Sequence, residues 1–270
     1  MAELRITILG CGSSGGVPRI GGHWGDCDPN DSRNRRRRCS ILVEREDEGG
    51  TTRVLVDTSP DMNNQLLDAG IGTLDGVVYT HSHADHVHGI DDLRMIVFNM
   101  RQRLPVWAEE VTRSDLLKRF GYAFIQPEGS PYPPILELHD IPGGRMKEPL
   151  SIPGAGSPID FQPFLVDHGM VDALGFRVAN VAYTPDVIEI YPESWAALEG
   201  LDCWIVDALR RSPHPSHSHL ENTLEWIEQA QPRQAVLTNM HIDLDYATVA
   251  EETPDNIMPA HDGLVLRFEV

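Results

Sequence analysis

The sequence has few cysteines and no long apolar run, and each shortage excludes a class of protein. The four cysteines are scattered without a Cys-x-x-Cys pair, at Cys11, Cys27, Cys39 and Cys203. A disulfide framework is therefore not expected. No apolar stretch reaches the roughly 18 residues that a transmembrane helix needs, and the first residues lack the apolar core of a secretion signal. We expect reduced thiols, no membrane contact and a cytoplasmic location.

Basic side chains are also scarce. The chain carries 41 acidic and 22 basic residues, for a formal net charge of −19. Long-range repulsion makes such a chain a poor binder of long RNA or DNA. The exception is a basic run, Arg33 and Arg35–Arg38. A solvated loop or ion pairs would explain any single arginine, whereas the run as a whole favours one or two guanidinium groups directed at a small phosphate.

The spacing of apolar residues predicts two series of strands with helices between them. Strands are expected at 4–9, 39–44, 52–57, 76–80, 104–108, 159–166, 174–178, 181–183, 203–207, 235–238 and 264–270, and helices at 61–69, 111–120 and 220–230. This order indicates an α/β fold in which two sheets pack face to face with helices outside. No linker or repeat divides the chain, so one domain is expected over residues 1–270. Residues 121–158 are rich in proline and glycine, and we expect a cap, an arm or a homodimer contact there.

The segment after the strand at 76–80 concentrates metal-binding side chains. It reads His81-Ser82-His83-Ala84-Asp85-His86, and imidazole and carboxylate are ligands that suit zinc, manganese or iron. Alternate residues of an extended segment face the same way, so His81 and His83 can bind one ion. After the chain turns, Asp85 and His86 can reach a second ion. An incidental histidine tract would lack the fixed carboxylate and the preceding strand.

Extended to Gly89, this segment resembles the HxHxDHxxG signature of the metallo-β-lactamase superfamily. The resemblance covers essentially the whole chain and implies a four-layer αββα sandwich with one or two metals at the edge between its sheets. Carried over by position, it implies two divalent cations (Zn²⁺ or Mn²⁺) and this ligand set: His81, His83 and His168 on one metal, Asp85, His86 and His241 on the other, and Asp186 between them. Taken alone, His168 could be a core histidine and Asp186 a helix N-cap.

The last ligand has two candidates. Relatives have Leu-Thr-His where this chain has Leu237-Thr238-Asn239. Either Asn239 occupies the ligand position, or the loop shifts and His241 supplies the nitrogen. We expect His241, because imidazole is the better ligand and the residue lies two positions on, on the same side of an extended segment.

Within the superfamily the chain is most similar to the phosphodiesterase branch of 5-phosphoribosyl 1,2-cyclic phosphate phosphodiesterases and tRNase Z. The segments that carry this likeness are Gly10–Pro18, Arg38-Cys39-Ser40, Val56-Asp57 and Asp262-Gly263. It implies His217 as a proton donor. The substrate-binding residues implied or suggested with it are Arg38, Ser40, His217 and His261. Asp57 is either a support for a ligand histidine or a plain strand-end aspartate. Only Cys27 remains of the cysteine cluster that holds a structural zinc in these relatives, so that zinc is not expected here.

The activity implied is a dinuclear metal-dependent phosphodiesterase for a small, nucleotide-like or phosphoribosyl phosphodiester, with a cyclic one favoured. Two cations that share a water molecule lower the pKa of that water from about 16 toward about 7, so a hydroxide nucleophile exists at neutral pH. Asp85 and His217 are the expected catalytic residues, the second as the acid that protonates the leaving oxygen. The alternatives are a tRNase Z-like RNA 3′-processing endonuclease, a thioester or lactam hydrolase, and a nucleotide-binding protein with little turnover.

Overall fold

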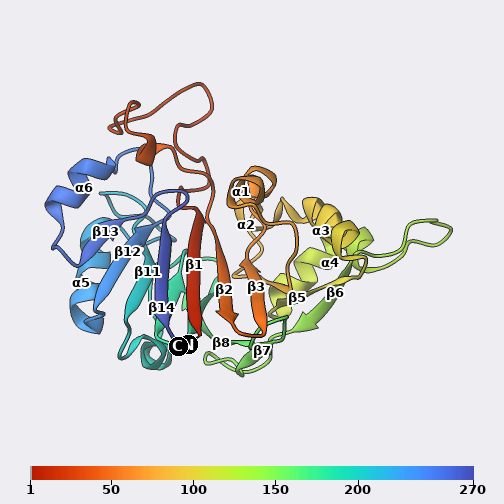
Figure 1. The fold of residues 1–270 in the computed structure, drawn as a ribbon. Helices are drawn as coiled ribbons and strands as arrows, with labels where there is room; N and C mark the ends of the chain where they lie inside the picture. The colour runs from red at the N-terminus through yellow and green to blue at the C-terminus, as the bar shows by residue number, and fades with distance from the viewer. Residues whose placement is uncertain (1) are drawn as a thin grey trace.

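Two seven-stranded sheets pack face to face with helices on their outer sides in the computed structural model, which describes residues 2–270 (Figure 1). This is the αββα sandwich expected from the sequence, and that prediction is confirmed. None of the helices in the described part of the chain combines the length and apolar character needed to cross a membrane.

The first sheet has the order β14-β1-β2-β3-β4-β5-β6. Its strands are, in chain order, β1 (Glu3–Gly10), β2 (Ser40–Asp47), β3 (Gly50–Val56), β4 (Gly76–Val78), β5 (Leu104–Ala108), β6 (Leu136–Asp140) and β14 (Val265–Glu269). The strands from β3 to β6 run parallel, and the others pair antiparallel. Because β14 pairs with β1, the two ends of the chain lie side by side, and Val270 N donates to Ala2 O over 3.0 Å (Figure 1).

The second sheet has the order β13-β12-β11-β10-β9-β8-β7. Its strands are β7 (Leu150–Ile152), β8 (Ile159–Asp167), β9 (Asp172–Val178), β10 (Val181–Thr184), β11 (Cys203–Asp207), β12 (Gln234–Thr238) and β13 (Ile257–Pro259). The strands from β10 to β13 are parallel, and β8 runs in the same direction because β9 lies antiparallel to both β8 and β10. The carboxyl ends of these strands therefore meet at one edge of the sandwich, where the functional loops begin.

The helices are α1 (Met62–Ala69), α2 (Ala84–Val87), α3 (Leu93–Met100), α4 (Glu110–Phe124), α5 (Leu220–Ala230) and α6 (Tyr246–Glu252), with short 3₁₀ turns at Ser32–Asn34, Ile90–Asp92 and Pro192–Leu198. Side chains of α1, α3 and α4 share a buried cluster with the first sheet, and side chains of α5 and α6 pack on the second. Figure 1 shows α5 and α6 on the side of the molecule opposite α3 and α4.

Alternation along the strands separates the two apolar cores. Ile41 and Val43 of β2 belong to the cluster between the sheets, whereas Leu42 belongs to the cluster beneath the helices. Val54 and Leu55 of β3 divide in the same way. Successive side chains of a strand point to opposite faces. A strand buried on both faces therefore shows a continuous apolar run, as these strands do.

The proline- and glycine-rich segment 121–158 is more regular than its composition indicates. Helix α4 continues to Phe124, β6 extends the first sheet beside β5, and β7 pairs with β8 in the second sheet. The loop between α4 and β6 extends away from the rest of the molecule (Figure 1). The segment thus supplies one edge strand to each sheet, and its expected role as a cap or dimer contact stays a prediction.

Close packing around Gly175 of β9, against the neighbouring strands β8 and β10 of the second sheet, predicts a large stability effect at this position. A Cβ atom there would lie 2.5 Å from Cε2 of the buried Phe164 and 2.7 Å from Cγ2 of Thr184. We expect Gly175→Ala to lower the free energy of unfolding by about 1–3 kcal/mol, because overpacking forces side chains from their preferred rotamers. Gly144→Ala is the matched control, since no atom lies within 4 Å of its Cβ position. Equal midpoints of thermal unfolding for the two variants would contradict the packing described.

Candidate metal centre and active site

Four of the predicted ligands converge where three strands end. His81 and His83 follow β4, His168 follows β8, and Asp186 follows β10. One donor atom from each lies within 4.8 Å of those of the others. His81, His168 and Asp186 are buried and His83 is exposed, so the group has an open side. Three imidazoles and a carboxylate at this spacing form a plausible site for a divalent cation.

The hydrogen bonding within this group also fits a cation. His81 Nε2 is buried without a hydrogen-bond partner and lies 3.7 Å from Asp186 Oδ2. His168 Nδ1 faces the carbonyl oxygen of Ser216 at 2.6 Å, so its proton is held there and the lone pair on Nε2 points inward. That Nε2 lies 3.1 Å from His83 Nδ1. Burial lowers the pKa of both His81 and His168, which favours the neutral, ligating form of each ring.

His86 and Asp85 lie on the other side of Asp186. His86 Nε2 is 3.2 Å from Asp186 Oδ1 and 3.7 Å from Asp85 Oδ2. Asp186 therefore presents one carboxylate oxygen to His81 and His168 and the other to His86. Burial would lower the pKa of His86, but the surrounding carboxylates, Asp186 and Asp57 first, outweigh it and raise that pKa well above its ordinary value. The carboxylates around His86 favour a positive charge at this ring, which a proton or a metal ion can supply.

Asp57 supports His86 from the end of β3. Its Oδ2 accepts a hydrogen bond from His86 Nδ1 over 2.7 Å and another from Thr80 Oγ1 over 2.7 Å, and its Oδ1 accepts from Thr80 N over 2.8 Å. The bond fixes the ring so that Nε2 points at Asp186. A carboxylate behind a ligand histidine is a common way to orient the ring and raise its basicity. Of the two interpretations of Asp57, these contacts support the first.

This contact predicts that Asp57→Asn weakens metal binding by about 10–100-fold, the usual effect of removing a partner behind a ligand. The apparent dissociation constant for Mn²⁺, measured by titration of the chelator-treated protein, tests it. Asp68→Asn is the control, since Asp68 is a surface carboxylate that pairs with Arg37. Unchanged affinity in Asp57→Asn would mean that His86 does not need this partner or is no ligand.

His217 lies beside the same centre with a carboxylate behind it. Its Nδ1 is 2.8 Å from Asp207 Oδ2, and its Nε2 lies 3.9 Å from Asp186 Oδ2. Burial would lower the pKa of His217, but Asp207 and then Asp186 outweigh it and raise that pKa to about 9. Burial raises the pKa of Asp207 to about 7. The two carboxylates therefore favour the protonated form of His217, the form that can act as an acid.

Asn239, and not His241, contacts the cluster. Asn239 is buried, and its Nδ2 lies 3.0 Å from Pro185 O and 3.3 Å from Asp186 Oδ1. The His241 ring turns elsewhere, with Nδ1 3.1 Å from Asp243 Oδ1 and Nε2 against the Arg19 guanidinium. The structure thus brings six of the seven predicted ligands together. His241 lies outside the group, because the chain at Asn239 adopts a left-handed φ of 59° and the two side chains diverge.

The basic run has structural partners. Arg38 Nε pairs with Asp61 over 2.9 Å, and Arg37 pairs with Asp68 and Asp262. Arg33 pairs with Asp31 and stacks on the Tyr246 ring, with its guanidinium carbon 4.0 Å from the ring centroid. These contacts tie the long connection between β1 and β2 to the rest of the molecule, and they agree with the ion-pair alternative stated for the single arginines.

Within the described residues 2–270, neither Ser40 nor His261 makes a hydrogen bond to a predicted ligand. The Ser40 hydroxyl is fully buried and donates to the carbonyl oxygens of Val56 and Asp57. His261 is half-buried, and its ring lies 6.1 Å from that of Tyr246. Substrate contacts by Arg38, Ser40 and His261 stay predictions.

Two residues near the centre were not predicted from the sequence. Asp207 ends an apolar strand as Asp57 does, and this pattern could have identified it. His214 has a ring 5.1 Å from that of His217, which extends the row of imidazoles toward the surface. Its only sequence signal is its place in a histidine-rich loop.

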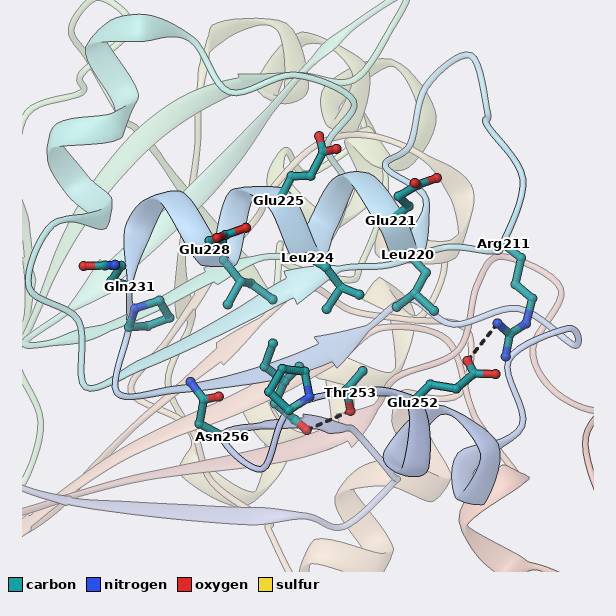
Figure 2. Close-up of a pocket in the computed structure, with 14 residues that line it drawn as sticks. Arg211, Leu220, Glu221, Leu224, Glu225, Glu228, Gln231, Glu252, Thr253 and Asn256 are labelled. Atoms are coloured by element: carbon teal, nitrogen blue, oxygen red, sulfur yellow. Dashed lines mark hydrogen bonds and ion pairs between the residues drawn. The ribbon is translucent and has the colours of Figure 1, made fainter.

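A separate groove lies away from this chemistry. Its volume is about 970 Å³, and it runs between α5 and the segment from α6 to β13, where Leu224 and Ile257 are among its apolar residues (Figure 2). Glutamates of α5 line its edge, and an Arg211–Glu252 ion pair closes one end (Figure 2). It contains no imidazole. We therefore place the active site at the histidine and aspartate cluster.

Comparison with known proteins agrees with this geometry. The family model described as beta-lactamase superfamily domain matches residues 52–242. The crystal structure of a new diphosphatase from the PhnP family shares 35% sequence identity with this chain. The TM-score is 0.86, over 100% of this chain and 99% of that one. Human tRNase Z, short form, is 14% identical, with a TM-score of 0.66 over 98% of this chain and 100% of that one.

A relative in Porphyromonas gingivalis named octanoyltransferase is 34% identical over 266 residues, which are 97% of this chain and 51% of that protein. The chain thus spans about half the length of this relative. The family match covers most of the chain, and the fold and the signature at 81–89 agree with it. The chain belongs to the beta-lactamase superfamily, and its similarity over the whole chain at 35% identity groups it with the PhnP family.

Proposed function

We propose that the protein is a metal-dependent hydrolase that cleaves a phosphodiester or diphosphate linkage in a small, nucleotide-like molecule. The observation that carries the proposal is His217. Its Nδ1 lies 2.8 Å from Asp207 Oδ2, which favours the protonated ring, and its Nε2 lies 3.9 Å from the central Asp186 carboxylate. Phosphoryl transfer to water needs a cation to neutralise phosphate oxygens and an acid for the leaving oxygen; the ligand cluster would hold the first, and His217 would supply the second.

Each residue has a distinct task in this proposal. His81, His83, His168 and Asp186 would hold one divalent cation, and Asp85, His86 and Asp186 a second. Bound cations would lower the pKa of water and neutralise charge on the phosphate. Asp57, itself held by Thr80, fixes the His86 ring. His217 gives its Nε2 proton to the leaving oxygen, and Asp207 holds the charged ring in place.

The cysteines do not support acyl transfer as the activity of this chain. The octanoyltransferase relative raises that possibility, and a cysteine nucleophile needs an accessible thiolate. All four cysteines are buried, and burial raises the pKa of each, to about 12 for Cys203. The similarity to a PhnP-family diphosphatase at 35% identity over the whole chain supports phosphorus chemistry instead.

The charge distribution supports a small substrate over transfer RNA. The net charge is −19, and Arg33, Arg37 and Arg38 are already paired with acidic side chains. A protein that binds a polyanion needs unpaired basic side chains along the surface that contacts the phosphates. Precursor tRNA is therefore the less favoured substrate.

A turnover screen tests the proposal. The purified protein, with Mn²⁺ or Zn²⁺ restored, is given cyclic phosphodiesters, linear phosphodiesters, dinucleoside diphosphates, precursor tRNA, a thioester and a lactam. We expect metal-dependent hydrolysis of at least one small phosphorus substrate and little of the others. Preferential cleavage of the thioester, the lactam or the tRNA would contradict it.

A further inference from the structure

We propose that the two cation positions of this chain differ in strength. One ion is held tightly by His81, His83, His168 and Asp186. A second, oxygen-preferring ion such as Mn²⁺ is held weakly by Asp85, His86 and Asp186. The cause is Asn239, whose side chain occupies the place of a fourth protein ligand and acts only as a hydrogen-bond donor.

The contacts of Asn239 fix the orientation of its amide. Nδ2 lies 3.0 Å from the carbonyl oxygen of Pro185, 3.3 Å from Asp186 Oδ1 and 3.2 Å from His217 Nδ1. The two oxygens can only accept, so the NH₂ group of the amide faces them. An amide nitrogen that donates two hydrogen bonds has no lone pair for a metal. Asn239 therefore restrains the Asp186 carboxylate from the second position and does not ligate an ion there.

His241 does not replace the missing ligand. Its backbone is fixed, because its N–H donates to Leu209 O over 2.8 Å and the preceding Met240 N–H donates to Cys11 O over 2.9 Å. One ring nitrogen faces Asp243 and the other faces the Arg19 guanidinium. A cationic guanidinium beside an imidazole nitrogen opposes binding of a second cation at that atom.

The two positions consequently differ in ligand chemistry. The first has three imidazole nitrogens and a carboxylate oxygen, a set that suits zinc-like ions. The second has a single imidazole, His86, between the carboxylates of Asp85 and Asp186. Carboxylate and water ligands favour harder cations such as Mn²⁺ and leave coordination positions open to solvent or phosphate oxygens.

Metal titration of the chelator-treated protein without substrate tests this inference. Bound Mn²⁺ is counted by equilibrium dialysis with elemental analysis, and paired ions are detected by electron paramagnetic resonance. We expect one ion per chain at low free Mn²⁺ and a second whose dissociation constant is at least about tenfold higher. In Asn239→His, the dissociation constant of the second ion should fall by about tenfold or more. Even a residue that only hydrogen-bonds to a ligand changes metal affinity by about 10–100-fold. Histidine tolerates a left-handed φ, so the backbone at this position need not change.

Two further variants separate the alternatives. His241→Ala should leave both dissociation constants unchanged, and loss of the second ion in this variant would overturn the inference in favour of His241. Asn239→Ala should retain a measurable second ion, whereas its loss would mean that the amide oxygen is a ligand. Two equally tight ions in the unaltered protein would also overturn it, and circular dichroism confirms that each variant is folded.

This inference depends on the proposed function only in that the cluster binds metal. The expected two-step metal titration without phosphoester hydrolysis would leave the inference intact and overturn the proposed function. Two equally tight ions together with efficient hydrolysis would overturn the inference and leave the proposed function intact.

Discussion

Replacing Asp186 by asparagine is expected to remove the metal from the protein and lower kcat/KM by about a thousandfold or more. The Asp186 carboxylate lies against both groups of ligands, with Oδ2 3.7 Å from His81 Nε2 and Oδ1 3.2 Å from His86 Nε2. Metal ions supply several kcal/mol of transition-state stabilisation, and each 1.36 kcal/mol is a factor of about ten in rate. Loss of the shared ligand should therefore remove most of the rate acceleration.

Metal content after dialysis and kcat/KM on the best small substrate measure this effect. Asp160→Asn is the matched control, because Asp160 is an exposed carboxylate of β8. Near-normal metal content in Asp186→Asn would mean that the carboxylate does not join the two positions. Asp186 would then not be a ligand shared by the two cation positions.

His217→Ala should retain the metal and lower kcat by about 10²–10⁴-fold, the usual contribution of a positioned acid. The loss should be greatest for substrates whose leaving oxygen is a poor leaving group, such as an alkyl alcohol. It should be small for p-nitrophenyl esters, whose leaving group needs no proton. His139→Ala is the control, since that ring stacks on Trp107 within the first sheet.

The pH dependence gives an independent test of His217. Asp207 and Asp186 raise its pKa to about 9, so the ring is protonated below that pH and loses its proton above it. Cations bound at Asp186 would cancel the contribution of that carboxylate and leave Asp207 to hold the charge. Turnover of an alkyl phosphodiester should therefore fall as the pH rises through the pKa of His217, and this alkaline limb should be absent in His217→Ala. Equal rates for alkyl and p-nitrophenyl esters in the variant would exclude His217 as the acid.

Much of the centre could be predicted from the sequence because its key segment is local. His81, His83, Asp85 and His86 lie within six residues after an apolar strand, so alternation and one turn suffice to bring them together. His168 and Asp186 follow the strands β8 and β10, whose carboxyl ends meet at one edge. Asp57 could be identified from the sequence in a similar way, since a polar residue at the end of a buried strand has few partners other than the residues of the site.

The remaining features depended on contacts between segments far apart in the chain. His241 was expected to face the centre by alternation, but Asn239 has a left-handed φ and that periodicity fails at this position. The partners of the basic run, Asp61, Asp68 and Asp262, come from distant elements, so the sequence could not show that the arginines are paired. Helix α6 and strand β13 were not predicted because they are short and their burial is set by packing on the second sheet.

Restoration of hydrolysis by added metal tests the central claim most directly. The protein is stripped with chelator, and hydrolysis of bis(p-nitrophenyl) phosphate is measured before and after adding Mn²⁺ or Zn²⁺, with Asp186→Asn in parallel. The account predicts no turnover in the stripped protein, restored turnover with metal, and none in the variant. Full activity after complete metal removal, or restored metal with no hydrolysis of any phosphoester, would contradict it.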